Sequence, residues 1–372
     1  MKLANKVYLN AFSCVCAAGL NIEEIFETLL RGNSAITNQS GYVDGAVMPL
    51  GKIPSEDDFF ELLEENVASL LTKTPWLVPS ETIVLVGSSV GGMCVAEKMF
   101  FTESNFKNIT VEELSIRAIA DKVVQKFGFK SALSFSTACT SSSIAIDFAY
   151  DLITQGLYKT VVVIGADELS SSAVNGFDRL GIASHSPTRP FDVQRNGINV
   201  AEGIAVLALS SSKTLQCVEI MGCGVSSDAY NITHPHPQGE GAMAAMNQAL
   251  KAAGIDASSI DYINAHGTGT IANDEIESAS IEKIFGGHPF VVSTKAVTGH
   301  TLGACGALEA AISAMSIIHN IIPACTNLTT PVNGSLSHPL ESIQTDVNYV
   351  LSNAFGFGGG NVSLVLGKVH AD

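Results

Sequence analysis

The sequence contains no apolar run of the roughly 20 residues that a membrane-spanning helix needs. Charged residues are scarce, at 15% of 372, whereas 46% of the residues are hydrophobic, so the chain can bury a large core. None of its eight cysteines forms a CxxC pair, and their spacing gives no disulfide or metal framework. We therefore expect a globular cytoplasmic protein with reduced thiols, no membrane span and no bound metal.

A net positive charge is absent as well. The chain has 20 Lys and Arg residues against 36 Asp and Glu residues, which gives a formal net charge of −16. Because phosphate binding requires a basic face, this balance argues against nucleic acid as a partner. An acidic protein partner would need a local cluster of basic side chains.

Residues 134–146 hold the first candidate for chemistry, Cys139. A strand-like segment precedes this cysteine, and residues 141–153 carry apolar side chains at helical spacing. Cys139 is therefore expected on a strand-to-helix turn, where backbone N–H groups and the helix dipole favour a thiolate and can bind an oxyanion. Buried cysteine is also a common packing residue, so this stretch alone leaves both interpretations open.

Strands alternate with helices along the chain, which is typical of a layered α/β fold. We expect strands at 6–12, 81–87, 160–166, 204–209, 217–223 and 261–264, and helices at 21–30, 55–65, 111–127, 141–153 and 241–253. Residues 290–310 repeat the design of the Cys139 region: a strand, a turn of small residues and a long helix. This predicts a duplicated fold, with an N-terminal half at 1–210 and a C-terminal half at 211–372.

Three further glycine-rich turns carry distinctive side chains. They hold His266, Lys295 with His300, and the segment 353–361 with its two phenylalanines. A lone histidine in such a turn is more often structural. Two histidines and a thiol on separate strand-end turns instead indicate a common site. The remaining histidines that we considered, His185, His234 and His236, are expected to be ordinary loop residues.

These motifs resemble those of the β-ketoacyl-ACP synthases of the elongating class, which belong to the thiolase-like condensing enzymes. The resemblance runs from about residue 6 to residue 366 and implies a duplicated, five-layered αβαβα fold. The matching segments are Thr-Ala-Cys-Thr-Ser at 137–141, Arg-Pro-Phe-Asp at 189–192, Ser-Asp-Ala-Tyr at 227–230, His-Gly-Thr-Gly-Thr at 266–270, Ser-Thr-Lys-Ala-Val-Thr-Gly-His at 293–300 and Ser-Asn-Ala-Phe-Gly-Phe-Gly-Gly at 352–359.

The resemblance implies a reaction centred on Cys139, His266 and His300. The Cys139 thiolate would take an acyl group from a thioester. The two histidines would then stabilise the enolate-like charge that forms as malonyl-ACP loses carbon dioxide. Attack of this carbanion on the acyl group would release a β-ketoacyl-ACP two carbons longer. No cofactor is implied beyond the 4′-phosphopantetheine that the carrier protein brings.

Supporting residues follow from the same resemblance. Lys295 is expected to be buried and paired with Glu277, with Asp274 nearby. A cluster of basic side chains is expected at the pocket mouth to meet an acidic acyl carrier protein, with these candidates: Lys122, Lys126, Lys130, Arg179 and Arg195.

The last glycine-rich segment is expected to form a gate. Phe355 and Phe357 flank Gly356, so aromatic bulk would block the pocket and the glycines would let the backbone move. The backbone N–H groups of Cys139 and Phe355 are the expected oxyanion hole. Gly360 departs from the threonine usual in the family, which puts the hydrogen bonding of this gate in doubt.

The resemblance leaves the pathway and the assembly open. The chain is similar to the ketosynthases of bacterial aryl-polyene clusters, and fatty-acid or type II polyketide elongation is the second choice. A homodimer and a heterodimer with a related subunit are both compatible with it. A non-catalytic chain-length partner is the main alternative, which Cys139 disfavours. A thiolase would need a second cysteine in the last turn, and a chain-initiating synthase would lack His300.

Overall fold

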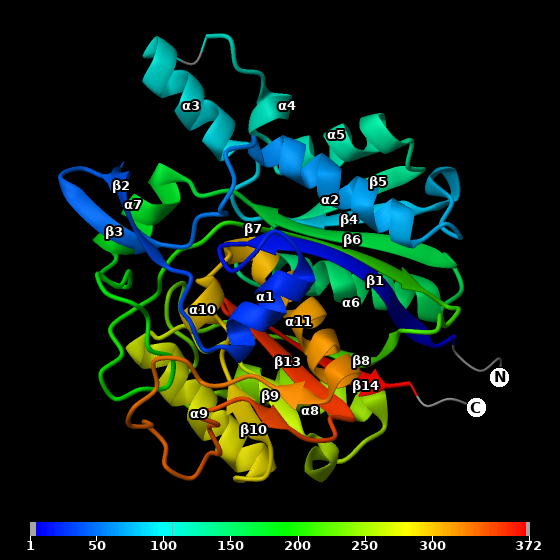
Figure 1. Ribbon diagram of the computed structural model, residues 1–372, viewed down its shortest axis with the longest axis vertical. Coiled ribbons are helices and arrows are strands. Elements are labelled where there is room, and N and C mark those ends of the chain that lie inside the picture. The colour runs from blue at the N-terminus through cyan, green and yellow to red at the C-terminus, as the bar shows by residue number, and fades with distance from the viewer. Residues whose placement is uncertain (1–4, 106, 370–372) are drawn as a thin grey trace.

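The computed structural model describes residues 5–105 and 107–369, in which ten strands form one mixed sheet (Figure 1). Two small hairpin sheets lie beside it, β2 (Thr37–Val43) with β3 (Ala46–Leu50) and β11 (Ile321–Ile322) with β12 (Ile343–Gln344). The order across the large sheet is β10 (Phe290–Val292), β9 (Tyr262–Asn264), β13 (Tyr349–Gly356), β14 (Gly360–Lys368), β8 (Val218–Ser227), β1 (Val7–Cys16), β7 (Gly203–Ser210), β6 (Thr160–Asp167), β4 (Ile83–Gly87) and β5 (Ser131–Phe135).

The two halves of this sheet repeat one pairing pattern. In the first half, β1–β7 and β7–β6 are antiparallel, whereas β6–β4 and β4–β5 are parallel. In the second half, β8–β14 and β14–β13 are antiparallel, whereas β13–β9 and β9–β10 are parallel. A short antiparallel pairing of β1 with β8 joins the halves. A duplicated unit would give this pattern, and the division after Ser210 stays a prediction.

Helices form three layers around the two half-sheets. The central layer holds α6 (Ser141–Thr154) and α11 (Cys305–His319), which pack on each other and contact strands of both halves, with α1 (Ile22–Leu30) beside them. The outer face of the first half is covered by α2 (Phe59–Lys73) and α5 (Arg117–Phe127). The opposite outer face is covered by α8 (Glu240–Ala253), against which α9 (Ile271–Phe285) packs. The expected five-layered αβαβα architecture is confirmed.

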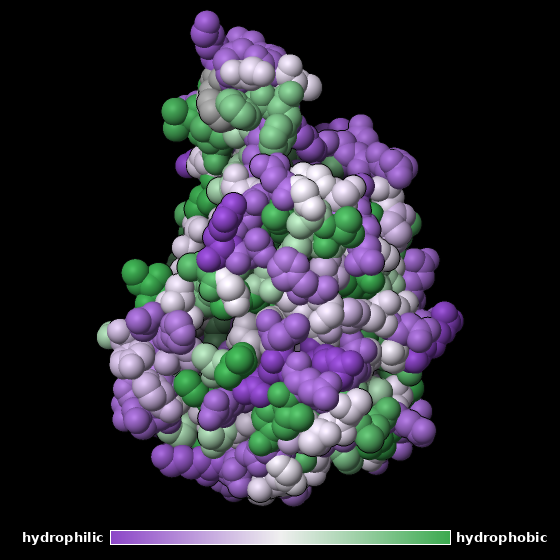
Figure 2. Space-filling model, turned by 90° about the vertical axis from the view of Figure 1, so that its left-hand side faces the viewer, coloured by the Kyte–Doolittle hydropathy of each residue, from purple (hydrophilic) through white to green (hydrophobic). Residues whose placement is uncertain are grey.

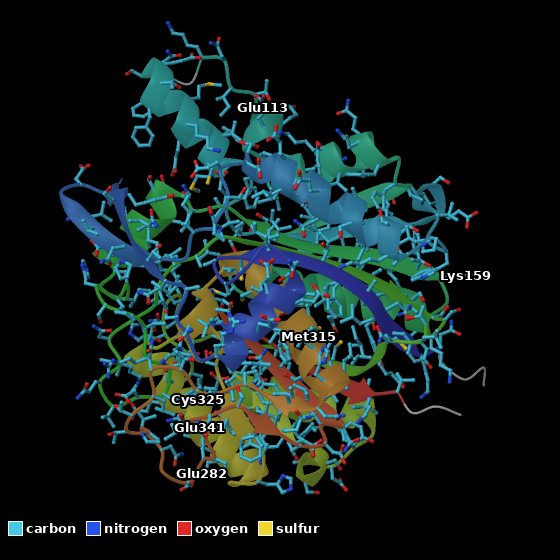
Figure 3. The ribbon with its side chains drawn as sticks, viewed as in Figure 1. Glu113, Lys159, Glu282, Met315, Cys325 and Glu341 are labelled. Carbon is cyan, nitrogen blue, oxygen red and sulfur yellow. The ribbon has the colours of Figure 1, made fainter. Side chains whose placement is uncertain are left out.

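The remaining helices are short or lie at the periphery. They are α3 (Met93–Glu103), α4 (Val111–Leu114), α7 (Ser171–Arg179), α10 (Lys295–Thr298) and three 3-10 turns, η1 (Pro79–Glu81), η2 (Ala257–Ser259) and η3 (Leu302–Ala304). In Figure 1, α3 projects from the layered body. Charged side chains such as Glu113, Lys159 and Glu282 lie at the surface, whereas Met315 lies among the layers (Figure 3).

One described segment, Leu302–His319, is long and apolar enough to cross a membrane, with a hydropathy of 1.4. However, 89% of this segment is buried inside the protein. Its apolar composition is explained by its place at the centre of the fold, because α11 has neighbours on all sides and presents apolar or small residues in every direction.

Most expected elements are confirmed, and four differ in their bounds. The strand expected at 217–223 is β8, which continues to Ser227. The first strand continues to Cys16 instead of ending at residue 12. The single helix expected at 111–127 is wrong, because Ser115 takes an extended conformation that separates α4 from α5. The acidic stretch 55–65 leads into α2, whose inner face is buried and whose capping box begins at Asp58.

The close contact of β4 with α6 gives a testable prediction. A Cβ added at Gly87 would lie 2.3 Å from the Ser142 nitrogen, so Gly87→Ala should displace the start of α6. We expect a loss of about 1–3 kcal/mol in the free energy of unfolding, measured by urea denaturation. Gly176→Ala is the matched control, because a Cβ there meets nothing within 4 Å and helix propensity favours alanine. Equal stability of the two variants would contradict this account of the contact.

Candidate active site

The turn that holds Cys139 joins β5 to α6 at the junction of the two halves. Ala138 has a φ of 55°, which few residues other than glycine adopt. Two hydroxyl groups stabilise this conformation by donating to the Ala138 carbonyl, Ser141 Oγ at 2.6 Å and Ser89 Oγ at 2.9 Å. Cys139 is only 8% exposed, immediately before the first turn of α6.

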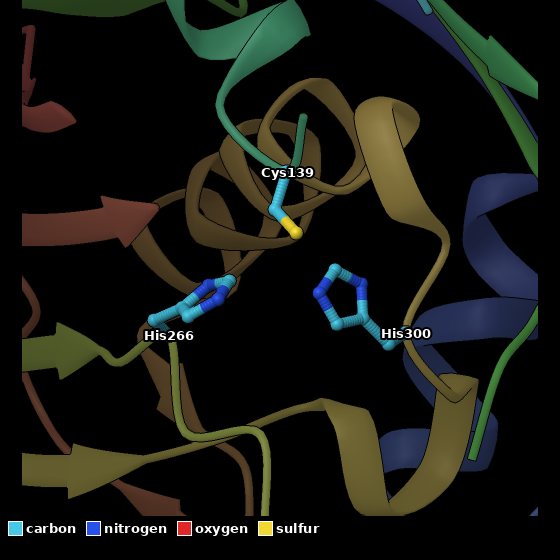
Figure 4. Close-up of side chains that lie close together, drawn as sticks. All are labelled: Cys139, His266 and His300. Carbon is cyan, nitrogen blue, oxygen red and sulfur yellow. The ribbon is translucent and has the colours of Figure 1, made fainter. Parts of the chain in front are cut away.

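Two histidines from the C-terminal half face this cysteine. His266 follows β9 and His300 follows α10, and their rings lie 5.4 Å apart at 86°. One ligating atom from each of Cys139, His266 and His300 lies within 4.8 Å of the others (Figure 4). The structure thus brings together the three side chains that the sequence singled out.

Both histidines are neutral, and a backbone contact sets the donor nitrogen of His300. The backbone N–H of Leu302 donates to His300 Nδ1 at 3.1 Å, so Nε2 carries the hydrogen of this imidazole. Burial, assisted by the Lys295 cation, lowers the pKa of His300 to about 3. Burial, Lys295 and His300 likewise hold the pKa of His266 well below its usual value. Both rings are therefore uncharged at neutral pH.

The Cys139 thiol does not show the low pKa expected from its place at a helix start. Burial raises its pKa to about 11, although the N–H groups of Phe357 and Cys139 and the Lys295 cation oppose this shift. The site therefore holds a thiol at neutral pH. Two backbone N–H groups face the sulfur, those of Cys139 and Phe357. The sequence had predicted Phe355 as the second of these donors. The Phe355 ring instead packs against His266, with centroids 5.9 Å apart.

Lys295 is buried, as expected, but its partner is not Glu277. The Lys295 ammonium pairs with Glu309 on α11, and both side chains are almost fully buried. Burial lowers the pKa of Lys295, but the Glu309 carboxylate more than compensates, so the pKa is raised overall. Sequence reasoning missed Glu309, although it is the single acidic residue in α11.

Glu277 and Asp274 hold the backbone of the His266 turn. Glu277 accepts from the N–H groups of His266 and Gly267, both at 2.8 Å. Asp274 accepts from Gly269 N at 3.1 Å and from Phe191 N at 2.7 Å. Both carboxylates lie on the buried side of α9, and they are supporting residues in this sense rather than partners of the lysine.

The glycine-rich segment around Gly356 lies over the cysteine and is tied to a second loop. The Phe357 ring packs against Phe177 of α7, with centroids 5.9 Å apart. Gly358 donates to the Ile232 carbonyl at 2.7 Å, and the Gly359 carbonyl accepts from Asp228 N at 2.8 Å. The sequence had signalled Asp228 only as part of a matching motif.

A cavity of about 310 Å³ reaches Cys139, His266 and His300 from the surface. Its mouth carries three exposed apolar side chains, Leu180, Ile232 and Ile271. Threonine and asparagine side chains line its walls, and His234, expected to be an ordinary loop residue, lines it too. On the face that holds α7 and the start of α9, apolar side chains alternate with hydrophilic ones around a hollow (Figure 2).

The basic cluster expected at the mouth is incomplete. Arg179 and Arg195 directly precede lining residues, and the Arg195 guanidinium donates to the Ile271 carbonyl at 2.8 Å. The three lysine candidates lie elsewhere, on or just after α5. Lys122 lies 3.5 Å from the centre of the Phe60 ring and Lys126 pairs with Glu64, both on α2. The expectation was therefore wrong for the lysines.

One cysteine and two histidines are also a donor set that zinc uses. The geometry does not favour a resident metal here. Because Leu302 donates to His300 Nδ1, the Nε2 of this ring carries hydrogen and offers no lone pair to an ion. The nearby Lys295 cation, which affects the pKa of all three side chains, would also repel one.

Two family models match the chain. The model described as "Beta-ketoacyl synthase, N-terminal domain" matches residues 57–214, and the "Beta-ketoacyl synthase, C-terminal domain" model matches residues 217–329. The chain belongs to the β-ketoacyl synthase family. This confirms the resemblance found in the sequence and, with it, the class of acyl-transferring condensing enzymes.

Individual relatives of this β-ketoacyl synthase cover nearly its whole length. The 3-oxoacyl-[acyl-carrier-protein] synthase 2 of Coxiella burnetii is 31% identical over 98% of this chain and 99% of its own. Among solved structures, the ketosynthase ApeO of Xenorhabdus doucetiae, in complex with its chain length factor ApeC, has a TM-score of 0.88 and 30% identity over 98% of each chain. A β-ketoacyl synthase from Burkholderia phymatum has a TM-score of 0.86 and 29% identity, over 98% of this chain and 100% of that one. These likenesses confirm the thiolase-like fold.

The raised pKa of Cys139 predicts how its alkylation depends on pH. Only the thiolate reacts with iodoacetamide, so the rate should rise about tenfold for each pH unit from about pH 7 to about pH 10. The rate is measured by peptide mass spectrometry at constant ionic strength, with Cys139→Ala as the control that assigns the reactive peptide. A rate that levels off below about pH 9 would contradict a pKa near 11.

The buried ion pair predicts the effect of Glu309→Gln. This change leaves the Lys295 cation without its carboxylate, which should cost about 3 kcal/mol in the free energy of unfolding by chemical denaturation. The double variant Lys295→Met with Glu309→Gln has no unpaired charge and should recover part of that loss. If the single variant is as stable as the wild type, the pair does not hold α10 to α11.

Proposed function

We propose that this chain is a β-ketoacyl-[acyl-carrier-protein] synthase, which lengthens an enzyme-bound acyl group with a malonyl unit by decarboxylative Claisen condensation. The observation that carries the proposal is the meeting of a buried thiol and two neutral histidines in one accessible cavity. Family membership supports the same reaction.

In the first half-reaction, Cys139 takes the acyl group from its carrier. The sulfur attacks the thioester carbonyl, and the oxyanion that forms can accept hydrogen bonds from the N–H groups of Cys139 and Phe357, which face the sulfur. The carbon–sulfur bond to the carrier then breaks. Because Cys139 begins as a neutral thiol, its proton must leave as the new bond forms, and it ends on the departing carrier thiol.

In the second half-reaction, His266 and His300 act on the malonyl thioester. Their N–H groups donate to its carbonyl oxygen, which gains negative charge as the bond to the carboxylate breaks and carbon dioxide leaves. Neutral imidazoles suit this role because they stay donors over a broad pH range. The enolate carbon attacks the acyl carbonyl on Cys139, and the sulfur leaves as a thiolate that Lys295 and the two N–H groups stabilise.

Phe355, Gly356 and Phe357 form the proposed gate of the site. Phe355 lies against His266, and Phe357 lies between the cysteine and α7. Gly358 and Gly359 have φ values of 86° and 80°, so the segment turns back sharply after Phe357. Movement of this segment would change access to Cys139 and the position of the Phe357 N–H together.

The proposed partner is an acyl carrier protein, whose 4′-phosphopantetheine is part of the substrate, so no separate cofactor is needed. We propose a cytoplasmic dimer, and the likeness to ApeO in complex with a chain length factor supports a related second subunit. The chain is proposed to consist of the halves 1–210 and 211–372. Aryl polyene, fatty-acid and polyketide elongation remain the candidate pathways. The non-catalytic partner is disfavoured because Cys139 and both histidines are present.

The proposal is tested by intact-mass spectrometry with acyl carrier proteins. The wild type should gain an acyl group on Cys139 that disappears when malonyl carrier protein is added, as a β-ketoacyl product two carbons longer forms. Cys139→Ala should gain none. His266→Ala and His300→Ala should still acylate but should condense about 10²–10³-fold more slowly, because they lack a donor to the developing enolate. A wild type that never acylates, alone or with a related subunit, would overturn the proposal.

A further inference from the structure

The buried carboxylate of Asp167 has no role in the reaction described above. It lies at the end of β6 with 1% of its surface exposed. It accepts hydrogen bonds from two chain segments. Ser88 Oγ at 2.6 Å, Ser89 N at 2.9 Å and Val90 N at 2.9 Å belong to the loop after β4, whereas Gly303 N at 2.7 Å belongs to η3 in the other half.

The first segment connects Asp167 to the turn that holds Cys139. Ser89, fixed through its N–H by Asp167, donates its hydroxyl to the Ala138 carbonyl at 2.9 Å. The Ala138 carbonyl and the Cys139 N–H belong to one planar peptide unit, so fixing the oxygen also fixes the direction of that N–H. Asp167 therefore helps to orient one of the two proposed oxyanion donors, together with Ser141 Oγ, which donates to the same carbonyl at 2.6 Å.

The second segment connects Asp167 to His300. Gly303 N is fixed by Asp167, and Leu302, with a φ of 51°, directly precedes it. The Leu302 N–H is the group that donates to His300 Nδ1 and so places the ring hydrogen on Nε2. The approach is too close for any side chain at 303, because a Cβ there would lie 2.8 Å from Asp167 Oδ2 and 2.7 Å from Ser89 N.

We infer that Asp167 is a positioning residue that holds the Cys139 turn of one half and the His300 turn of the other in a single geometry. The effect of Asp167 on catalysis rests on the proposed function. Every group that Asp167 binds is a donor, so an amide in its place would present its own N–H₂ to at least one N–H or O–H. Asp167→Asn is therefore expected to release one of the two turns without changing the size of the side chain.

Glu202→Gln is the matched control. Glu202 is also buried at 7% exposure and accepts from two backbone N–H groups, Ile53 at 2.9 Å and Leu169 at 3.1 Å. Its carboxylate contacts neither the Cys139 turn nor the His300 turn. The two variants thus make the same chemical change, from a carboxylate to an amide, at buried side chains that bind backbone N–H groups. Of the two carboxylates, only that of Asp167 connects the two turns.

The test compares kinetics per folded enzyme. For Asp167→Asn we expect kcat to fall about 100-fold with KM for malonyl carrier protein within about threefold, since misplacing reacting groups slows the chemical step more than it weakens binding. Glu202→Gln should keep kcat within about twofold. Ser89→Ala removes only the hydrogen bond to Ala138, so it should slow acylation of Cys139 and leave malonyl decarboxylation within about twofold.

A spectroscopic measurement separates this inference from the proposed function. In protein with isotope-labelled histidine, His300 is assigned with His300→Ala, and its nitrogen shifts should report the Nε2–H tautomer. Asp167→Asn should shift this resonance towards a tautomer mixture, and Glu202→Gln should not. The expected tautomer change does not depend on activity. If the wild type formed no β-ketoacyl product, that result would overturn only the proposed function. An unchanged His300 tautomer together with wild-type kcat in Asp167→Asn, or equal losses in both variants, would overturn the inference.

Discussion

The site depends on buried carboxylates that accept hydrogen bonds from backbone N–H groups. The turns of Cys139, His266 and His300 leave the regular sheet and helices, so their N–H groups need partners away from water. Asp167 supplies them for the loop after β4 and for η3, and Glu277 and Asp274 supply them for the His266 turn. Each carboxylate accepts the hydrogen bonds that backbone carbonyls would accept in a regular strand or helix. The positions of the reacting side chains follow from these bonds.

Burial also sets the charge states within the site. The same loss of solvation raises the pKa of Cys139 and lowers the pKa of both histidines, because it disfavours the charged form of each. A thiolate–imidazolium pair is therefore not the resting state. The site holds neutral groups, and its one cation, Lys295, is balanced by Glu309. Such a site is suited to stabilising negative charge that forms on a substrate, since no thiolate–imidazolium pair occupies the histidine N–H groups.

The sequence predicted the fold and the three central side chains because each lies in a small-residue turn, after a strand for Cys139 and His266 and before the long helix α11 for His300, and such patterns are local. It failed where the partner is distant. Glu309 lies 14 positions after Lys295 on a helix otherwise free of charge, and only the burial of α11 makes that carboxylate need a cation. The choice between Phe355 and Phe357 depends on where β13 ends, and the structure ends it at Gly356, so that Phe357 lies in the turn over the sulfur.

The two-fold pattern of the sheet explains why the site lies where it does. The parallel strands β4, β5 and β6 end near the Cys139 turn, and β9, β10 and β13 end near the turns of the histidines and Phe357. Carboxyl ends of parallel strands meet at one edge, where loops are free to carry functional side chains. The antiparallel pairing of β1 with β8 makes the parallel strands of the two halves run in opposite directions, and the turns of the two halves meet through the packing of α6 on α11 and of η3 on β6. Neither half holds both the thiol and the imidazoles, so the geometry between the halves has to be fixed by contacts that cross them, and the bond from Gly303 to Asp167 is one such contact.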